Sequence, residues 1–162
     1  MNRDITFIYD DASDAPDSIA TLTGLEHFGG LLYRRRRLWE HTLEAARAAG
    51  FTTPRHLKTH DERRRLATEL TECPPETRFV YMTSDIVSVD PELLCRFLAK
   101  LSWSDEDLLS QPVGAHLGSG LSCLSAATLR SLLLASQSKN ARDAWWIEHQ
   151  ERIRHIPPAD EL

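Results

Sequence analysis

The sequence predicts an α/β domain built as a three-layer sandwich, with helices on both faces of a mostly parallel central sheet. Short segments rich in β-branched and aromatic residues alternate along the chain with segments of helical periodicity. Such alternation is typical of parallel strands joined by helical crossovers. The length of 162 residues suits one hydrophobic core and is short for two, so we expect a single domain over residues 1–162.

The predicted strands differ in strength. The clearest covers residues 78–85 and ends at Asp85, and the first covers residues 5–9 and stops at Asp10 and Asp11. A weaker strand is expected at residues 55–58. Shorter candidates follow at residues 112–115, 120–124 and 152–156.

Helices are expected between these strands. Residues 37–49 carry a helical apolar face, and Gly50 follows as a left-handed stop. Residues 61–70 predict a charged surface helix, and Ser125 predicts the cap of a helix that runs to about residue 135. Further helices are expected after Asp90 and around the adjacent Trp145 and Trp146, of which one should be core and the other could line a pocket or a partner surface.

Composition and charge indicate an ordinary cytoplasmic protein. The net charge of −5 argues against a nucleic acid as the main partner. The amino terminus lacks the features of a signal peptide, and no apolar run is long enough to span a membrane. Three widely spaced cysteines fit neither a disulfide framework nor a zinc site, so free, mostly buried thiols are expected. A homodimer or a larger parent protein stays open.

Three carboxylates stand where strands end. Asp85 closes the best strand, at the position where open α/β sheets bind ligands and metals. Asp10 and Asp11 could complete an acidic pocket for a divalent ion such as Mg²⁺ if the first and third strands are neighbours. The alternative is that Asp85 caps a loop and that the other two are turn formers.

The four consecutive arginines from Arg34 to Arg37 are a second candidate site. They lie between the glycine pair Gly29–Gly30 and a helix start, where guanidinium groups and backbone amides could hold a phosphate, with Arg34 and Arg35 as the best placed. A solvated charge run is the alternative. Arg63, Arg64 and Arg65 are expected at the surface, paired with acidic residues of their own helix.

Three stretches of the chain resemble one known family. They are residues 29–51, where a glycine-led strand enters a helix with an alanine-glycine stop; residues 82–94, with Ser84, Asp85 and then Asp90-Pro91-Glu92; and residues 118–129. Together they are similar to nucleotidyltransferases, including the molybdenum-cofactor guanylyltransferase-like proteins. The resemblance implies a GT-A nucleotidyltransferase-like sheet that binds a nucleotide or nucleotide sugar, a metal at Asp85, and an acceptor side at Gly118, Ser119 and Gly120.

One departure from that family bears on activity. The family opens with a glycine-rich loop that cradles the triphosphate, whereas residues 9–17 of this chain are acidic and contain no glycine. Carboxylates repel phosphates unless metal ions intervene. Three functions therefore stay open: a transferase that moves a nucleotidyl group to a phosphorylated sugar or alcohol, an inactive member of the fold that binds a ligand or a protein, and, as a weaker alternative, a receiver-like signalling domain.

Overall fold

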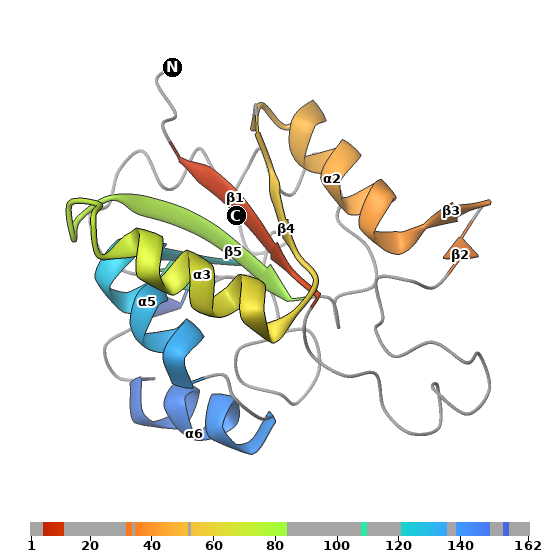
Figure 1. Ribbon diagram of the computed structural model, residues 1–162. Helices are drawn as coiled ribbons and strands as arrows, with labels where there is room; N and C mark the ends of the chain where they lie inside the picture. The colour runs from red at the N-terminus through yellow and green to blue at the C-terminus, as the bar shows by residue number, and fades with distance from the viewer. Residues whose placement is uncertain are drawn as a thin grey trace.

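The computed structural model describes residues 5–11, 32–33, 35–51, 53–83, 108–109, 121–135, 139–149 and 154–155. Within these ranges the chain forms a six-stranded sheet of strand order β4-β1-β5-β7-β6-β8 and a small separate hairpin, β2-β3 (Figure 1). The strands of the sheet are β1 (Thr6–Asp10), β4 (Arg55–Leu57), β5 (Arg78–Thr83), β6 (Leu108–Leu109), β7 (Leu121–Ser125) and β8 (Arg154–His155).

The sheet is mixed but mostly parallel. β1 lies between β4 and β5 and runs parallel to both, with Ile8 opposite Arg55 on one side and Tyr81 on the other. β7 runs antiparallel to β5 and β6, and β6 pairs parallel with β8. The predicted α/β class with a mostly parallel sheet is therefore confirmed.

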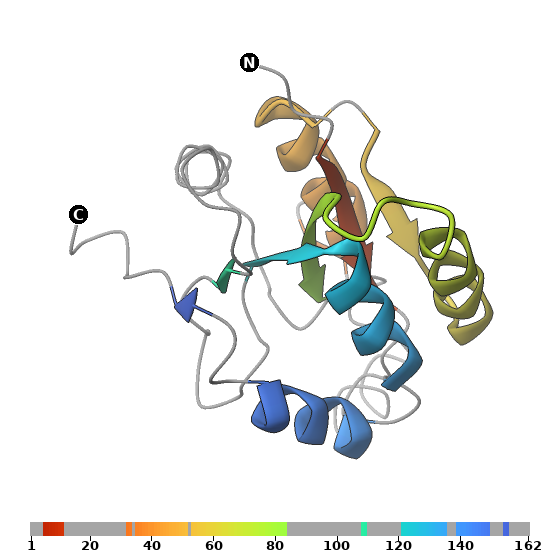
Figure 2. The same ribbon diagram turned by 90° about the vertical axis from the view of Figure 1, so that its left-hand side faces the viewer.

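Helices cover both faces of the sheet, as the sequence predicts (Figure 2). α2 (Leu38–Ala48) covers one face, where its Leu43 and Ala46 join a core cluster with Phe7, Tyr9 and Val80. The other face carries α3 (His60–Leu70), α5 (Ala126–Ala135) and α6 (Lys139–His149). The second core cluster lies there; its strand members include Ile8, Phe79, Tyr81 and Leu124, and its helix members Leu66, Leu129 and Trp146.

The helix ends follow from local chemistry. Gly50, just after α2, has φ 108°, a left-handed conformation that glycine adopts without steric cost. Thr59 caps α3, because its Oγ1 accepts a hydrogen bond of 3.2 Å from the Glu62 backbone N–H. Ser125 does the same for α5, accepting from the Thr128 N–H at 3.3 Å, as expected from the sequence. These hydrogen bonds satisfy backbone N–H groups in the first turns of α3 and α5.

Some expectations need correction. Trp145 and Trp146 are both buried, at 5% and 2% exposure, in an edge-to-face pair, so neither lines an open surface. Arg63 is buried at 3% exposure, so α3 is not simply a surface helix. β6 was not expected, since two residues give no periodicity. The candidate strand at residues 112–115 and the helix after Asp90 lie outside the described residues.

The remaining expectations concern cysteines and membranes. Cys123 is a buried free thiol and Cys73 a half-buried one, as predicted, whereas Cys95 lies outside the described residues. None of the described helices has the length and apolar character needed to cross a bilayer.

Candidate functional site

The strand order reverses at β1: the chain passes from β1 outward to β4 and then back across β1 to β5. α2, the helix described between β1 and β4, covers one face of the sheet, and α3, between β4 and β5, covers the other. In open α/β sheets, ligands bind outside the carboxyl ends of the strands at such a reversal, which here are β1 and β5, with β4 beside β1. The polar residues described at this edge are Asp10, Asp11, His56, Lys58 and Thr83.

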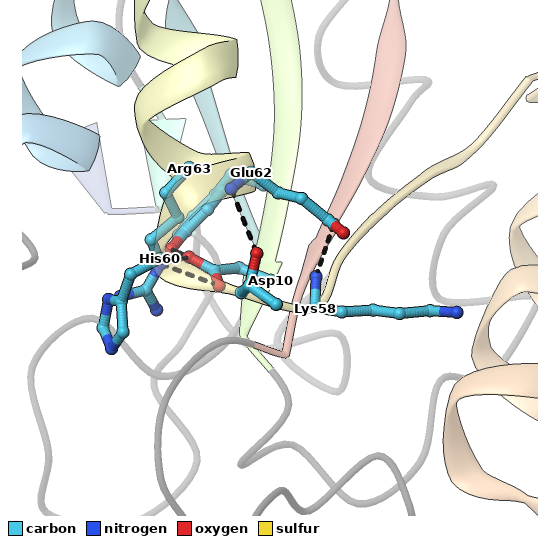
Figure 3. A network of polar contacts seen from close by, with 7 residues as sticks. Asp10, Lys58, His60, Glu62 and Arg63 are labelled. Carbon is cyan, nitrogen blue, oxygen red and sulfur yellow. Dashed lines mark hydrogen bonds and ion pairs between the residues drawn. The ribbon is translucent and has the colours of Figure 1, made fainter.

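Asp10 stands in the centre of a buried polar network on the α3 side (Figure 3). The Arg63 Nε–H donates to both carboxylate oxygens, at 3.0 Å to Oδ1 and 2.8 Å to Oδ2. The Tyr81 hydroxyl also donates to Oδ2, at 2.5 Å. His60 Nδ1 lies 3.3 Å from Arg63 Nη1, at the first turn of α3. Both charges are thus compensated inside the domain, as burial requires.

Tyr81 resists ionisation in this network. Burial, followed by the negative charge of Asp10, raises the pKa of the Tyr81 hydroxyl well above its usual value, while the positive charges of Arg63 and Arg142 oppose the rise. The hydroxyl therefore stays a hydrogen-bond donor to Asp10 throughout the ordinary pH range.

The raised pKa of Tyr81 predicts a loss of stability in alkali. Above about pH 10 the unfolded chain loses the Tyr81 proton while the folded chain keeps it, so unfolding releases a proton. This contribution is complete below about pH 10, and above it the unfolding free energy falls by up to about 1.4 kcal/mol per pH unit. Tyr81→Phe lacks this contribution, so in urea titrations its free energy of unfolding should fall less steeply above about pH 10 than that of the native chain. Equal slopes would contradict the assignment.

Asp11 belongs to a second group of side chains, on the α2 side. Its backbone N–H donates to the Leu57 carbonyl at 2.8 Å, which extends the pairing of β1 and β4 by one step. Its carboxylate Oδ2 lies 3.3 Å from His56 Nε2. The His56 ring stacks on Trp39 of α2, with centroids 5.1 Å apart and planes at 27°, and also contacts Tyr9 at 5.2 Å. The Lys58 Nζ lies 5.4 Å from the centroid of the Trp39 ring.

Comparison with solved structures identifies the fold. A nucleotidyl transferase from Methanothermobacter thermautotrophicus superposes with a TM-score of 0.59 at 15% identity, over 95% of this chain and 88% of that one. The Mycobacterium tuberculosis protein Rv0371c gives 0.61 at 18% identity over the same shares, and its structure is also known in complex with manganese. The 2-C-methyl-D-erythritol 4-phosphate cytidylyltransferase from Thermus thermophilus gives 0.54 at 15% identity, over 96% and 90%.

The chain has the nucleotidyltransferase fold. This confirms the resemblance found in the sequence. No family model and no curated protein sequence matches the chain. Because the identities are low, the likeness concerns the nucleotidyltransferase fold and not the chemistry of its individual residues.

Only some of the predicted site residues lie within the described part of the chain. Asp10 and Asp11 point to opposite faces of the sheet, as successive strand-end residues do, and bond to different partners. Among the described residues, no three histidine, cysteine or acidic side chains gather as a metal site. The remaining members of the predicted metal, phosphate and acceptor sites lie outside the described residues: Gly29, Gly30, Arg34, Ser84, Asp85, Gly118, Ser119 and Gly120. A metal site that joins Asp85 to the first strand therefore stays a prediction.

The arginine run is partly described. Arg36 and Arg37 form β3, which pairs antiparallel with β2 (Leu32–Tyr33), and Arg36 makes an exposed ion pair with Glu44. Arg35 is exposed in the hairpin turn with φ 68°, a conformation that carries a steric cost for a residue with a Cβ. The Arg37 backbone N–H donates to Glu40 at 2.8 Å. The prediction that Arg35 contacts a phosphate is not tested by this arrangement.

Three residues of the site were not predicted from the sequence: Arg63, Tyr81 and Trp39. Arg63 has a detectable signal, because it shares one face of α3 with the buried Leu66, Ala67 and Leu70. A charged residue within an apolar stripe indicates a buried partner, here Asp10. The pairing of Trp39 with His56 has no local signal, since it depends on how α2 crosses β4.

Proposed function

We propose that this domain binds a nucleotide or nucleotide sugar at the carboxyl ends of β1, β4 and β5, as a divergent nucleotidyltransferase. The observation that carries this proposal is the reversal of strand order at β1, between β4 and β5, in a domain of nucleotidyltransferase fold. Asp11, His56 and Lys58 stand at that point and offer charged and hydrogen-bonding groups. Arg34 and Arg35 would contact phosphate from the neighbouring hairpin.

The proposal includes a divalent metal held by Asp85, which follows the last residue of β5 by two positions. Carboxylate oxygens suit Mg²⁺ and Mn²⁺, and a solved protein of this fold binds manganese. At Asp10 a metal would have to displace Arg63 and Tyr81 from a fully buried carboxylate. Asp11 is the proposed partner for Asp85: its carboxylate contacts His56 Nε2 at 3.3 Å, and a metal would take the place of that contact.

The proposed reaction is nucleotidyl transfer to a phosphorylated sugar or alcohol. An oxygen of the acceptor forms a bond to the α-phosphorus, and the bond to the departing pyrophosphate breaks. Catalysis of this kind depends mainly on positioning and on stabilising charge. In this proposal the acceptor lies against Gly118, Ser119 and Gly120, as the family resemblance implies.

Thermal stability against a panel of nucleotides tests the proposal. Unfolding is followed with nucleoside triphosphates and nucleotide sugars, with and without Mg²⁺ or Mn²⁺. A nucleotide at a hundred times its dissociation constant adds about 2.7 kcal/mol, which raises the melting temperature by roughly 5–10 °C. We expect such a rise only when metal is present, and its loss in Asp85→Asn.

The matched control is Asp61→Asn, which removes an exposed carboxylate of α3 that is paired with Arg64. This variant should keep the full nucleotide effect. If no nucleotide stabilises the native chain with either metal, or if both variants lose the effect equally, the proposed metal-nucleotide site is wrong.

A second candidate function is nucleotide binding without turnover. Two observations favour it: the Asp10 carboxylate is committed to Arg63, and residues 9–17 lack the glycines of a triphosphate loop. Release of pyrophosphate in the presence of metal and acceptor distinguishes the transferase from the binding module. A binding module would be stabilised by the nucleotide but would release no pyrophosphate. A receiver-like role has less support, because such domains use a parallel doubly wound sheet and β7 runs antiparallel to β5.

A further inference from the structure

We propose that Trp39 is the surface on which the base of the nucleotide stacks; this inference rests on the proposed function and names its base-binding residue. Trp39 lies in the first turn of α2, beside the carboxyl end of β4. It is half-buried, packing partly against the core cluster on the α2 face of the sheet. It is therefore an aromatic surface at the edge of the sheet where ligands of α/β domains bind.

The indole is held in place by its neighbours. The His56 ring stacks on it at 5.1 Å, and that imidazole is in turn fixed by Tyr9 at 5.2 Å and by Asp11 at 3.3 Å. His56 is itself nearly buried, with 9% of its side chain exposed. A ring that is already ordered loses little conformational freedom when a ligand binds, which favours stacking on it.

A cation lies over the Trp39 ring. Lys58 is exposed, and its Nζ lies 5.4 Å from the centroid of the Trp39 ring. Its backbone is fixed, because its N–H donates to Glu62 Oε2 at 2.8 Å. Figure 3 shows the Lys58 side chain extending away from the Asp10–Arg63 network. An aromatic ring with an exposed ammonium group close to it suits a ligand that is flat at one end and anionic at the other.

A nucleotide has this chemistry. Its base would stack on Trp39, and its phosphates would lie near Lys58. Every base has a π-face, so stacking alone discriminates little between bases and favours the larger purines through contact area. The Trp39 surface would therefore supply affinity for the base, and other groups would select its identity.

The test compares two ligands that share phosphates and differ in the base. Binding of a nucleoside triphosphate and of inorganic triphosphate, each with Mn²⁺, is measured by calorimetry for the native chain, Trp39→Phe and Trp39→Leu. Loss of an aromatic stack should weaken the binding of the nucleoside triphosphate to Trp39→Leu by roughly tenfold to a hundredfold. Inorganic triphosphate should bind equally to all three proteins. Trp39→Phe, which keeps a ring, should retain most of the affinity and serves as the folded control.

Indole fluorescence gives an independent readout. A base stacked on Trp39 should quench part of the emission of the native chain, and that part should be missing in Trp39→Phe. The stacking role is wrong, while the proposed function stands, if Trp39→Leu binds the nucleotide as tightly as the native chain does. The same conclusion follows if its affinities for the nucleotide and for inorganic triphosphate fall alike. If the native chain binds inorganic triphosphate but no nucleotide, or binds neither, both proposals are overturned.

Discussion

Replacing Arg63 with methionine should lower the free energy of unfolding by about 3–5 kcal/mol, because it leaves the Asp10 carboxylate buried without its counter-ion. Asp10 has no exposed surface and Arg63 only 3%. A hydrogen bond from the neutral Tyr81 hydroxyl cannot neutralise a full negative charge. Equilibrium unfolding in urea measures the loss.

The control for Arg63 is its neighbour Arg64, which makes an ion pair with Asp61 on the exposed side of the same helix. Arg64→Met should change the unfolding free energy by less than about 1 kcal/mol. The double variant Asp10→Asn with Arg63→Met removes both charges and should recover part of the loss. Equal effects of Arg63→Met and Arg64→Met would show that the Asp10–Arg63 pair does not hold the fold together.

Phe7→Ala should have an effect of similar size, about 3–5 kcal/mol, for a different reason. Phe7 lies in the interior strand β1, has no exposed surface and contacts the Phe51 ring at 5.3 Å between centroids. Truncation leaves a cavity between the sheet and α2 that the neighbours cannot fill without moving both elements. The urea midpoint should fall accordingly.

The comparison for Phe7 is Ile147→Ala on α6, where the side chain is 56% exposed. That variant should stay within about 0.5 kcal/mol of the native chain. A loss below about 1 kcal/mol for Phe7→Ala would mean that the β1–α2 layer is loosely packed, against the burial described here.

Local signals in the sequence predict much of the fold. The β-branched and aromatic runs locate β1 and β5, whereas β4 was expected only as a weaker strand. The apolar periodicity with Gly50 bounds α2 to within two residues. The carboxyl end of β1 carries the two carboxylates, Asp10 and Asp11, that the sequence predicts there. These features are predictable because propensity, periodicity and stop signals agree within each segment.

Other features depend on contacts between distant segments. No local pattern gives the direction of β7, which pairs antiparallel with β5, with Ser122 opposite Tyr81, 41 positions earlier. The burial of Arg63 depends on Asp10, 53 positions earlier. The prediction that the arginine cluster lies at the surface was therefore right for Arg64 and wrong for Arg63. The face of the helix on which an arginine lies, and not the charge of its neighbours, determines whether it is buried.

The Asp10–Arg63 pair also bears on function. It makes one of the two strand-end carboxylates structural, so the charge at the ligand edge comes from other groups, with Asp11 and Lys58 the described candidates. A site with fewer carboxylates repels phosphate less. This arrangement partly offsets the acidic segment after β1.

The central claim is that nucleotide and metal bind at the carboxyl ends of β1, β4 and β5. Backbone amide NMR with Mn²⁺ and a stabilising nucleotide tests it directly, because the paramagnetic ion broadens the signals of nearby amides. The claim predicts broadening at Asp11, Lys58 and Thr83 and sharp signals at the opposite edge, at Thr6 and Arg78. Broadening centred on that opposite edge, or none with nucleotide and Mn²⁺ both in excess, would contradict it.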